Sequence, residues 1–515
     1  MSKTSSTVHG PNGSIPKANT WLLRTEHHGE ERGRTYFKSR STREIRNLQM
    51  RKNISHATTT IREKRKRVVS EVPNWEDLRT RASQIKQHTL ANLDVYLEEF
   101  ERNVTKAGGK VHWARDAAEA REIALELVRE SGASSVIKVK SMVTEEIGLN
   151  AYLSENGIEA TETDLAELIC QLAGDESSHI LVPAIHRNRV EIRDIFEATF
   201  AQKGSLEADP PKIAEAARKH LREKFLRSTV AISGGNFLVA ETGSVAIVES
   251  EGNGRMCLTL PNNVISIVGI EKVIPTMEDL EVFLTLLPRS STGERMNPYT
   301  TIWTGRPPAQ MAPEKETTED RKSYNIILLD NGRTRVLSDE VGSQALACIR
   351  CSACLNVCPV YERVGGHSYE SVYPGPIGAI LTPQLVGDEL AGDLAFASTL
   401  CGACYEVCPV KINIPEILIH LRSIHSDHRR DTMSGNLERG SFGIVGIVMG
   451  NTNLFNIASS SVSLILKYGG PLLNRVGKYL PPINGWVESR NLPKAPNGSL
   501  RDAYRKGTLD DLLKK

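Results

Sequence analysis

The chain has 515 residues, of which 40% are hydrophobic and 24% are charged, a balance typical of a soluble globular protein with two or three domains. Its formal net charge of +2 argues against a general nucleic-acid binder. The first residues lack the continuous apolar segment of a secretory signal peptide, so we expect the protein to stay in the cytoplasm.

The N-terminal part of the chain divides into two sections. Residues 1–35 are polar and rich in Gly, Ser and His, and we expect them to be disordered. Residues 36–105 carry apolar side chains at helical spacing and are predicted to form helices. A basic segment within residues 32–67 ends in "REKRKR". We interpret it as a solvated helix face or a partner-docking arm, with contact to RNA or a membrane as the alternative.

Residues 106–305 change to an alternation of helix and strand patterns. Amphipathic runs such as "DAAEAREIALELVRE" alternate with apolar, β-rich runs such as "SSVIKVKS", "SSHILVPAI" and "NNVISIVGIEKVI". This alternation predicts an α/β domain, an open sheet with helices on its faces.

This domain contains polar and glycine residues that are candidates for ligand binding. No GxGxxG or GxxxxGK[ST] fingerprint is present, so a dinucleotide site is not indicated. Turn chemistry alone also accounts for the candidates in the two runs "SGGNF" and "AETGS". They are Gly235, Asn236, Glu241, Thr242 and Gly243. His186, in "PAIHRNR", is either a site residue or a hydrogen-bonded structural histidine.

A polar linker is expected at residues 306–335, in which the strand-like run "YNIILLDNGR" leads into a cysteine-rich region at residues 336–425. Seven of the nine cysteines lie in two segments of this region, with the spacings CxxCxxCxxxCP and CxxCxxxCP. They are Cys348, Cys351, Cys354, Cys358, Cys401, Cys404 and Cys408. Three cysteines at steps of three, followed by Cys-Pro, are typical of [4Fe-4S] ligation, whereas structural zinc sites use two separated pairs.

In two-cluster ferredoxins the Cys of each Cys-Pro pair binds the neighbouring cluster. Under this pattern Cys348, Cys351, Cys354 and Cys408 bind cluster 1. Cluster 2 receives Cys358, Cys401 and Cys404, and is therefore short of one thiolate. Ser398 stands three residues before Cys401, where a fourth ligand is expected. It is either an oxygen ligand or the N-cap of the next helix, and cluster 2 could be isolated as [3Fe-4S].

The other two cysteines, Cys170 and Cys257, are predicted to be small buried hydrophobic side chains. The C-terminal region, residues 426–515, is predicted to be helical. Residues 440–466 within it carry no charge, but asparagines and serines interrupt the stretch. We favour a packed helix pair over a transmembrane span, with membrane association at most peripheral or through a partner.

Ordered motifs along the chain resemble the lactate-utilisation iron–sulfur proteins of the LutB type, also called YkgF. The motifs are "KSMVTEEIGLN", "HILVPAIHRNR", "FLVAETGSVAIVESEGN", "LLPRSSTGE", "CIRCSACLNVCPVY", "GGHSY", "YPGPIGAILTP" and "LCGACYEVCPVKINIPE". The resemblance covers most of residues 36–515. The present chain differs in its longer polar N-terminus and in "CSAC" where "CGAC" is more usual.

The resemblance implies an α/β LUD domain at residues 106–305, followed by an all-α, two-cluster ferredoxin-like domain with two [4Fe-4S] clusters on the seven cysteines. It also implies LutA-like and LutC-like companion proteins in the oxidation of L-lactate to pyruvate. A [4Fe-4S] cluster passes one electron at a time, so the two-electron centre is expected on a partner. We interpret the chain as an electron-relay subunit without independent catalysis. Two alternatives are a relay for another 2-hydroxy acid such as glycolate, and a LUD-domain catalyst with redox-sensing clusters.

Overall fold

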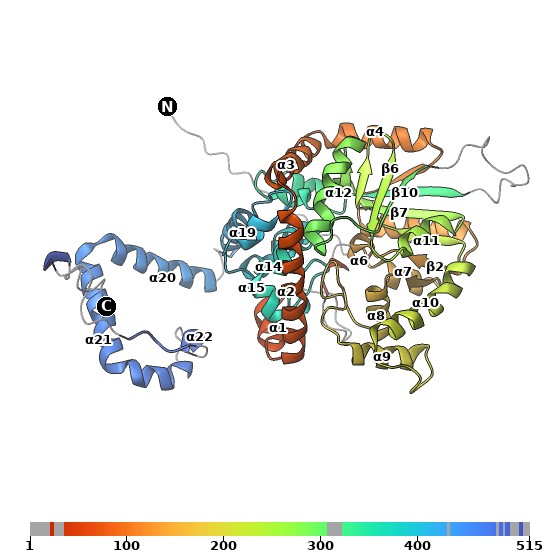
Figure 1. The fold of residues 1–515 in the computed structure, drawn as a ribbon. Helices are drawn as coiled ribbons and strands as arrows, with labels where there is room; N and C mark the ends of the chain where they lie inside the picture. Colours follow the sequence, from red (N-terminus) through yellow and green to blue (C-terminus); the bar gives the residue numbers. More distant parts are fainter. Residues whose placement is uncertain are drawn as a thin grey trace, which may run out of the picture. The chain divides into compact units, whose positions relative to one another are not determined.

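The computed structural model describes residues 21–24, 35–305, 322–429, 433–479, 484–487, 490–494 and 504–507 (Figure 1). These residues belong to two compact units, Met1–His425 and Ser426–Lys515. The first unit contains the α/β part and all nine cysteines, and the second is helical.

The predicted N-terminal helices are confirmed. They are α1 (Phe37–Glu44), α2 (Leu48–Ser70), α3 (Trp75–Ala91) and α4 (Leu93–Lys106). The Asn47 side chain accepts a hydrogen bond from the Met50 N–H and so caps α2. Helix α2 lies between α12 of the α/β part and α14 and α15 of the cysteine-rich part (Figure 1). It therefore joins the two parts of the first unit.

A six-stranded parallel sheet forms the centre of the α/β part, as predicted. Its strand order is β1-β10-β7-β4-β2-β3. The bounds are β1 (Lys110–Ala114), β10 (Ser323–Leu329), β7 (Asn263–Gly269), β4 (Val230–Ser233), β2 (Ser135–Lys138) and β3 (Glu159–Glu162). The strands are apolar over most of their length because helices cover both faces.

One face of the sheet packs against α5 (Ala117–Glu130) and α7 (Leu149–Glu155). The other packs against α8 (Leu165–Ala173), α9 (Arg189–Thr199), α10 (Pro210–Arg227) and α4. The remaining helices of this part are α6 (Met142–Glu146), α11 (Asn253–Thr259) and α12 (Met277–Ser291), with the short η2 (Ile270–Lys272).

A second, smaller sheet of mixed strand direction lies beside α4. Its strand order is β8-β5-β6-β9. The bounds are β8 (Val273–Ile274), β5 (Phe237–Val239), β6 (Ser244–Glu249) and β9 (Tyr299–Thr304). Strands β5 and β6 form an antiparallel hairpin, and their buried side chains contribute to the same core as α4.

Three expectations about local structure need correction. Residues 306–335 are not a linker throughout. They include β10, which pairs with β1 and β7 inside the sheet, and the beginning of α13 (Arg333–Leu337). The strand expected over residues 177–185 is absent, because this apolar run turns and packs against the cysteine-rich part. Residues 21–24 are not a disordered extension: Leu22 and Leu23 are buried, and Leu23 bridges to Ser371. Most of the remaining residues of 1–35, and residues 306–321, lie outside the described residues.

The cysteine-rich part is built from short helices, as the all-α prediction requires. They are η4 (Gly342–Ala347), α14 (Ala353–Val357), α15 (Pro359–Val364), η5 (His367–Tyr369), α16 (Gly375–Val386), α17 (Asp388–Ala391), η6 (Gly392–Phe396), α18 (Ala403–Val407) and α19 (Ile414–His428). Their buried side chains share one core with α2, α3 and α12.

The second unit contains α20 (Met433–Gly450), α21 (Thr452–Val476), η7 (Gly477–Tyr479) and α22 (Asn484–Val487). Within the part of the chain that the structure describes, no single helix is long and apolar enough to cross a membrane. Two consecutive helical segments, residues 439–450 and Thr452–Val476, meet the length and composition criteria together. The chain bends by 108° between them.

Candidate iron–sulfur site

The two cysteine segments repeat the same backbone path. In the first, Arg350 and Ser352 have φ of 60° and 63°, and in the second Leu400 and Gly402 have φ of 54° and 83°. Each segment continues into a five-residue helix, α14 or α18, that ends at the Cys of a Cys-Pro pair. Residues other than glycine rarely adopt positive φ. The shared path therefore indicates that both segments are shaped by the same requirement, the placement of their cysteine side chains.

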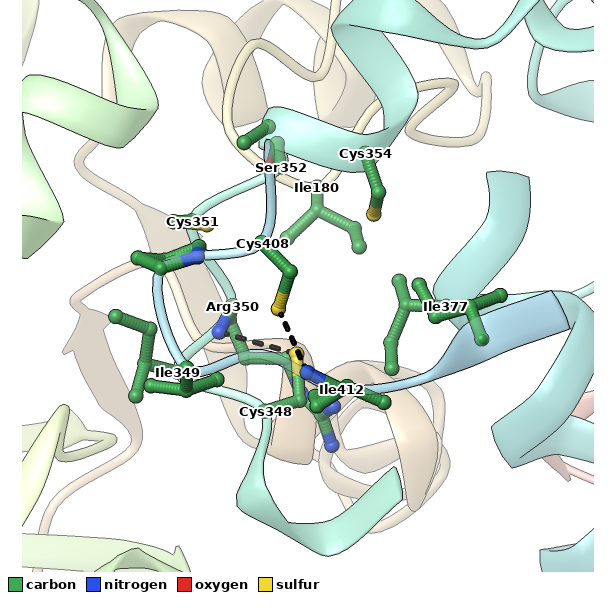
Figure 2. A pocket seen from close by; sticks show the side chains of 14 residues that line it. Ile180, Cys348, Ile349, Arg350, Cys351, Ser352, Cys354, Ile377, Cys408 and Ile412 are labelled. Atoms are coloured by element: carbon green, nitrogen blue, oxygen red, sulfur yellow. Dashed lines mark hydrogen bonds between the residues drawn. The ribbon is translucent and has the colours of Figure 1, made fainter. Parts of the chain in front are cut away.

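Four cysteines line one cavity, as predicted for cluster 1 (Figure 2). Cys348, Cys351 and Cys354 come from the first segment, and Cys408 comes from the end of the second. The other lining residues are mostly apolar: Ile180, Ile349, Ala353, Ile377, Pro409, Val410, Ile412 and Ile414, with Arg350 and Ser352. The crossing of Cys408 into the first group follows from the fold and matches the expected pattern.

Backbone amides point at two of these sulfur atoms. The Arg350 N–H donates to Cys348 Sγ at 3.4 Å, and the Ile412 N–H donates to Cys408 Sγ at 3.4 Å (Figure 2). Burial raises the pKa of Cys408 to about 11 and also raises the pKa of Cys351 and Cys354. Four thiolates can coexist in so apolar a cavity only with a compensating cation, and iron supplies that charge. The donor set therefore fits a [4Fe-4S] cluster.

The three cysteines predicted to bind cluster 2 also come together. Burial, with smaller contributions from the neighbouring sulfur atoms of Cys358 and Cys401, raises the pKa of Cys404 to about 12. The pKa of Cys358 is likewise raised by burial, with a contribution from Cys401. Cys358 and Cys404 are buried, whereas Cys401 is exposed. In the first group Cys348 and Cys354 are half-buried, and Cys351 and Cys408 are buried. The exposed cysteine of the seven therefore belongs to the second group.

Ser398 is placed in the loop before Cys401. Its Oγ accepts a hydrogen bond from the Leu400 N–H at 3.1 Å. The N-cap of α18 is Gly402, so the expectation that Ser398 caps this helix is wrong. Ser398 instead closes a short turn immediately before the ligand segment.

A buried charged network adjoins the first group, and sequence reasoning missed it. Lys272 donates from Nζ to the Cys348 carbonyl oxygen at 3.1 Å, and burial lowers the pKa of Lys272 to about 7. Glu271 Oε1 lies 3.5 Å from Arg350, and its Oε2 lies 2.6 Å from Arg333. The only signal in the sequence is a pair of charges inside the apolar run "IVGIEKVI". Cations so close to a cluster favour its reduced, more negative state.

Arg333 is the centre of that network. Its guanidinium binds Glu146 through two hydrogen bonds of 2.8 and 2.9 Å, in addition to Glu271. Tyr373 donates from its hydroxyl group to Glu146 at 2.6 Å. Since Glu146 and Glu271 belong to the α/β part and Tyr373 to the cysteine-rich part, the network ties the two parts together.

The five glycine and polar candidates in the α/β part have structural contacts. Asn236 Oδ1 accepts from the Val248 N–H at 2.9 Å, and Glu241 Oε2 accepts from the Met277 N–H at 3.0 Å. Thr242 Oγ1 lies 2.7 Å from Ser244 Oγ. A Cβ atom at Gly243, whose φ is +66°, would lie 2.4 Å from Val104 N. At Gly235, a Cβ would press on Val245 and Val268 at 3.0 and 3.1 Å. These contacts support turn and packing roles for all five residues.

His186 also makes structural hydrogen bonds. Its Nε2 lies 2.8 Å from Asp175 Oδ2 and its Nδ1 lies 2.7 Å from Ser178 Oγ. Asp175 also accepts from Arg187 at 2.6 Å. His367, from the cysteine-rich part, has a ligand atom within 4.8 Å of those of Asp175 and His186. Because Arg187 already neutralises the Asp175 carboxylate, we assign His186 a structural role in the contact between the α/β part and the cysteine-rich part.

The two remaining cysteines lie apart from both groups. Cys170 is in α8 and Cys257 is in α11, and both are buried, as predicted. Burial raises the pKa of Cys257 to about 12, so it stays protonated at neutral pH.

Comparison with known proteins agrees with this geometry. A family model described as LUD domain matches residues 97–328, and one described as 4Fe-4S dicluster domain matches residues 344–412. The dicluster match indicates two iron–sulfur clusters. The LUD match extends to residue 328 and so includes almost all of β10, in agreement with the corrected boundary.

Curated relatives are similar over nearly the whole chain. Lactate utilization protein B 1 of Bacillus mycoides is 38% identical over 481 residues, covering 93% of this chain and 97% of that protein. Lactate utilization protein B of Bacillus velezensis is 40% identical over 477 residues, with coverages of 92% and 97%. The protein of the same name from Oceanobacillus iheyensis is 45% identical over 394 residues, with coverages of 76% and 80%.

Proposed function

The chain belongs to the lactate utilization protein B family, and from this membership we propose that it is the iron–sulfur electron-transfer subunit of a system that oxidises L-lactate to pyruvate. The observation that carries the proposal is the pair of cysteine groups, in which Cys408 crosses to the cavity of the first segment. This arrangement suits two clusters close enough to pass electrons between them.

The chemistry of lactate oxidation assigns the other steps to companion proteins. The reaction releases two electrons and two protons, whereas each cluster, when bound, accepts and passes on one electron and no hydride. We therefore propose that LutA-like and LutC-like companions supply the two-electron centre, and that this chain relays electrons without turning over lactate alone. The absence of a dinucleotide fingerprint in the sequence supports this division.

The two groups differ in access to the surface, which suggests a direction of transfer. Cys348, Cys351, Cys354 and Cys408 hold the inner cluster, and Cys358, Cys401 and Cys404 hold the outer one. Cys401 is exposed, and so are its neighbours Leu400 and Tyr405. We propose that a redox partner exchanges electrons with the outer cluster at this surface. Cysteines that are not paired in disulfides are favoured in a reducing compartment, which supports a cytoplasmic location.

The test is reconstitution under anaerobic conditions. The purified holoprotein is expected to show the absorbance of iron–sulfur clusters but negligible oxidation of L-lactate until the companion proteins are added. Cys408→Ala should lose about half of the bound iron and the reconstituted activity. Cys170→Ala is the matched control and should retain both.

Three outcomes would contradict the proposal. Substantial lactate turnover by the purified chain alone would make it a catalyst rather than a relay. Activity with glycolate but not with L-lactate would change the substrate. Full activity after Cys408→Ala would remove the inner cluster from the electron route.

A further inference from the structure

The second unit exposes an unusual number of large apolar side chains. In α20, the exposed fractions of Phe442, Ile444 and Ile447 are 67%, 65% and 65%. In α21, Ile457 and Leu464 are exposed to 64% and 61%. Surface apolar residues are ordinary when single, but a continuous set of this kind marks a surface that another phase or molecule covers.

The large apolar side chains of α20 cover most of its circumference, and no polar side opposes them. Successive residues of a helix are about 100° apart, so Phe442, Ile444, Val445, Ile447 and Met449 cover roughly 220° of the circumference of α20. The side between them is occupied by small residues, mainly glycines. A helix that packs on one partner protein needs a single apolar stripe, whereas a helix that is apolar all round needs an apolar surrounding.

Helix α21 is different because it is amphipathic. Leu454, Ile457, Leu464, Ile465, Tyr468 and Leu472 fall on one side of the helix. Ser459, Ser463 and Lys467 fall on the opposite side. A helix with one apolar and one polar side lies in the plane of a membrane interface rather than across it.

The length of the uncharged stretch and the residues at its two ends agree with shallow insertion of α20 and α21 into a lipid bilayer. Residues 440–466 contain no charged side chain; Arg439 precedes them and Lys467 and Tyr468 follow. The Lys467 ammonium lies 5.7 Å from the Tyr468 ring centre, an aromatic and cationic pair of the kind found at headgroup level. The uncharged parts of α20 and α21 are about 16 and 22 Å long, at 1.5 Å per residue, shorter than the hydrocarbon core of about 30 Å. The 108° bend between them turns the chain back before it could cross (Figure 1).

From these observations we infer that α20 and α21 insert together into one leaflet of a lipid bilayer and attach the protein to the membrane surface. α20 enters the acyl region, and α21 lies at the interface with its serine face toward the headgroups. Arg439 and Lys467 meet anionic headgroups at the two ends of the uncharged stretch. The inference concerns where the protein works and does not depend on its substrate.

The experiment is vesicle flotation of the full-length holoprotein, with phosphatidylcholine vesicles that contain phosphatidylglycerol. The wild type is expected to float with the vesicles and to remain bound at high salt, since insertion of apolar side chains is not screened. Replacing both Ile444→Glu and Ile447→Glu should lower the bound fraction at least about tenfold. Leu48→Glu and Leu226→Glu are matched controls, because these leucines of the first unit are 72% and 62% exposed, and both should float like the wild type.

A second measurement does not depend on any variant. Vesicles should slow amide hydrogen exchange of wild-type α20 and α21 and leave α10 unchanged. Two results would overturn the inference: a wild type that stays with the soluble fraction, or binding that the two glutamates do not weaken. Self-association in solution that the same glutamates abolish, without flotation, would assign these helices to a second copy of the chain instead.

Discussion

Ser398 occupies in the second cysteine segment the position that Cys348 occupies in the first. Cys348 Sγ accepts a hydrogen bond from the N–H two residues later, Arg350, at 3.4 Å, and Ser398 Oγ accepts from the N–H two residues later, Leu400, at 3.1 Å. Arg350 and Leu400 both have positive φ. The oxygen of Ser398 is therefore held by the same turn that holds a cluster ligand in the first segment.

The first prediction follows from that equivalence. With Cys358, Cys401 and Cys404 as its thiolates, the outer cluster has one iron without a sulfur ligand from this chain, and that iron should be labile. Electron paramagnetic resonance of gently oxidised protein should show a [3Fe-4S]⁺ signal that increases with exposure to air. Ser398→Cys should suppress this signal several-fold, because thiolate is the stronger iron ligand.

Ser343→Cys provides the control for this substitution, because it adds a thiol at a half-buried position of η4, outside both groups. It should leave the signal unchanged. Two equally air-stable [4Fe-4S] clusters that do not respond to Ser398→Cys would mean that another residue completes the outer site.

A second prediction concerns the stability of the joint between the α/β and cysteine-rich parts. Arg333, Glu146 and Glu271 are all at most 1% exposed. Arg333→Met leaves the buried Glu146 carboxylate without a cation and Glu271 with only the more distant Arg350, which should lower the free energy of unfolding of the first unit by about 3–5 kcal/mol. Urea denaturation followed by circular dichroism measures this loss.

The exposed pair of Arg295 and Glu71 is the comparison for that measurement, with an Nε to Oε2 distance of 2.6 Å. Arg295→Met should leave the denaturation midpoint essentially unchanged, because water screens this pair. An equal effect of the two substitutions would show that burial of the Arg333 network does not matter for stability.

The third prediction concerns pH. Lys86 is 2% exposed and donates to the Glu271 carbonyl oxygen at 2.5 Å. Burial lowers its pKa from 10.5 to about 8. Between these two values the unfolded chain binds a proton that the folded protein does not, so this residue makes stability rise as pH increases from about 8 to about 10.5. Below about pH 8 both states are protonated and the contribution no longer changes.

Lys86→Met should remove this contribution. The denaturation midpoint of the wild type, measured relative to the variant, should increase from about pH 8 to about pH 10 and stay constant between about pH 6 and 7.5. If the denaturation midpoints of the wild type and the variant changed with pH in parallel over the whole range, the lowered pKa of Lys86 would be contradicted.

The fourth prediction concerns docking by the basic segment. The structure reduces the number of basic residues that are available for it. Arg62 donates to Glu362 and to the Asn356 carbonyl oxygen, and Arg65 donates to the Val407 carbonyl oxygen. These two residues hold α2 against the cysteine-rich part. Lys64, Lys66 and Arg67 are exposed on α2. They are the basic residues of "REKRKR" that a partner can reach.

Replacing these three exposed residues by Gln should weaken association with the companion proteins several-fold at low salt and much less at high salt. Iron content should not change. Replacing Arg62 and Arg65 instead should lower thermal stability. Association that is equally salt-dependent in wild type and triple variant would assign docking to another surface.

The sequence by itself determined the features that depend on local pattern. The spacing of Cys348, Cys351 and Cys354 predicted three ligands of one cluster, because steps of three place thiols around a single cluster. The alternation of helix and strand patterns was sufficient for the open α/β sheet, and the uncharged C-terminal stretch was visible as such.

Only the tertiary structure decided which residues meet across long separations. The run at residues 177–185 has the composition of a strand but is buried against the cysteine-rich part, because burial can be satisfied by any apolar partner. β10 joined the sheet from within the expected linker for the same reason. Lys272 shows in the sequence only as a charge inside an apolar run, and Arg333 carries no local signal. Such buried charges are stable only where their partners, here the Cys348 carbonyl and two glutamates, arrive from distant parts of the chain.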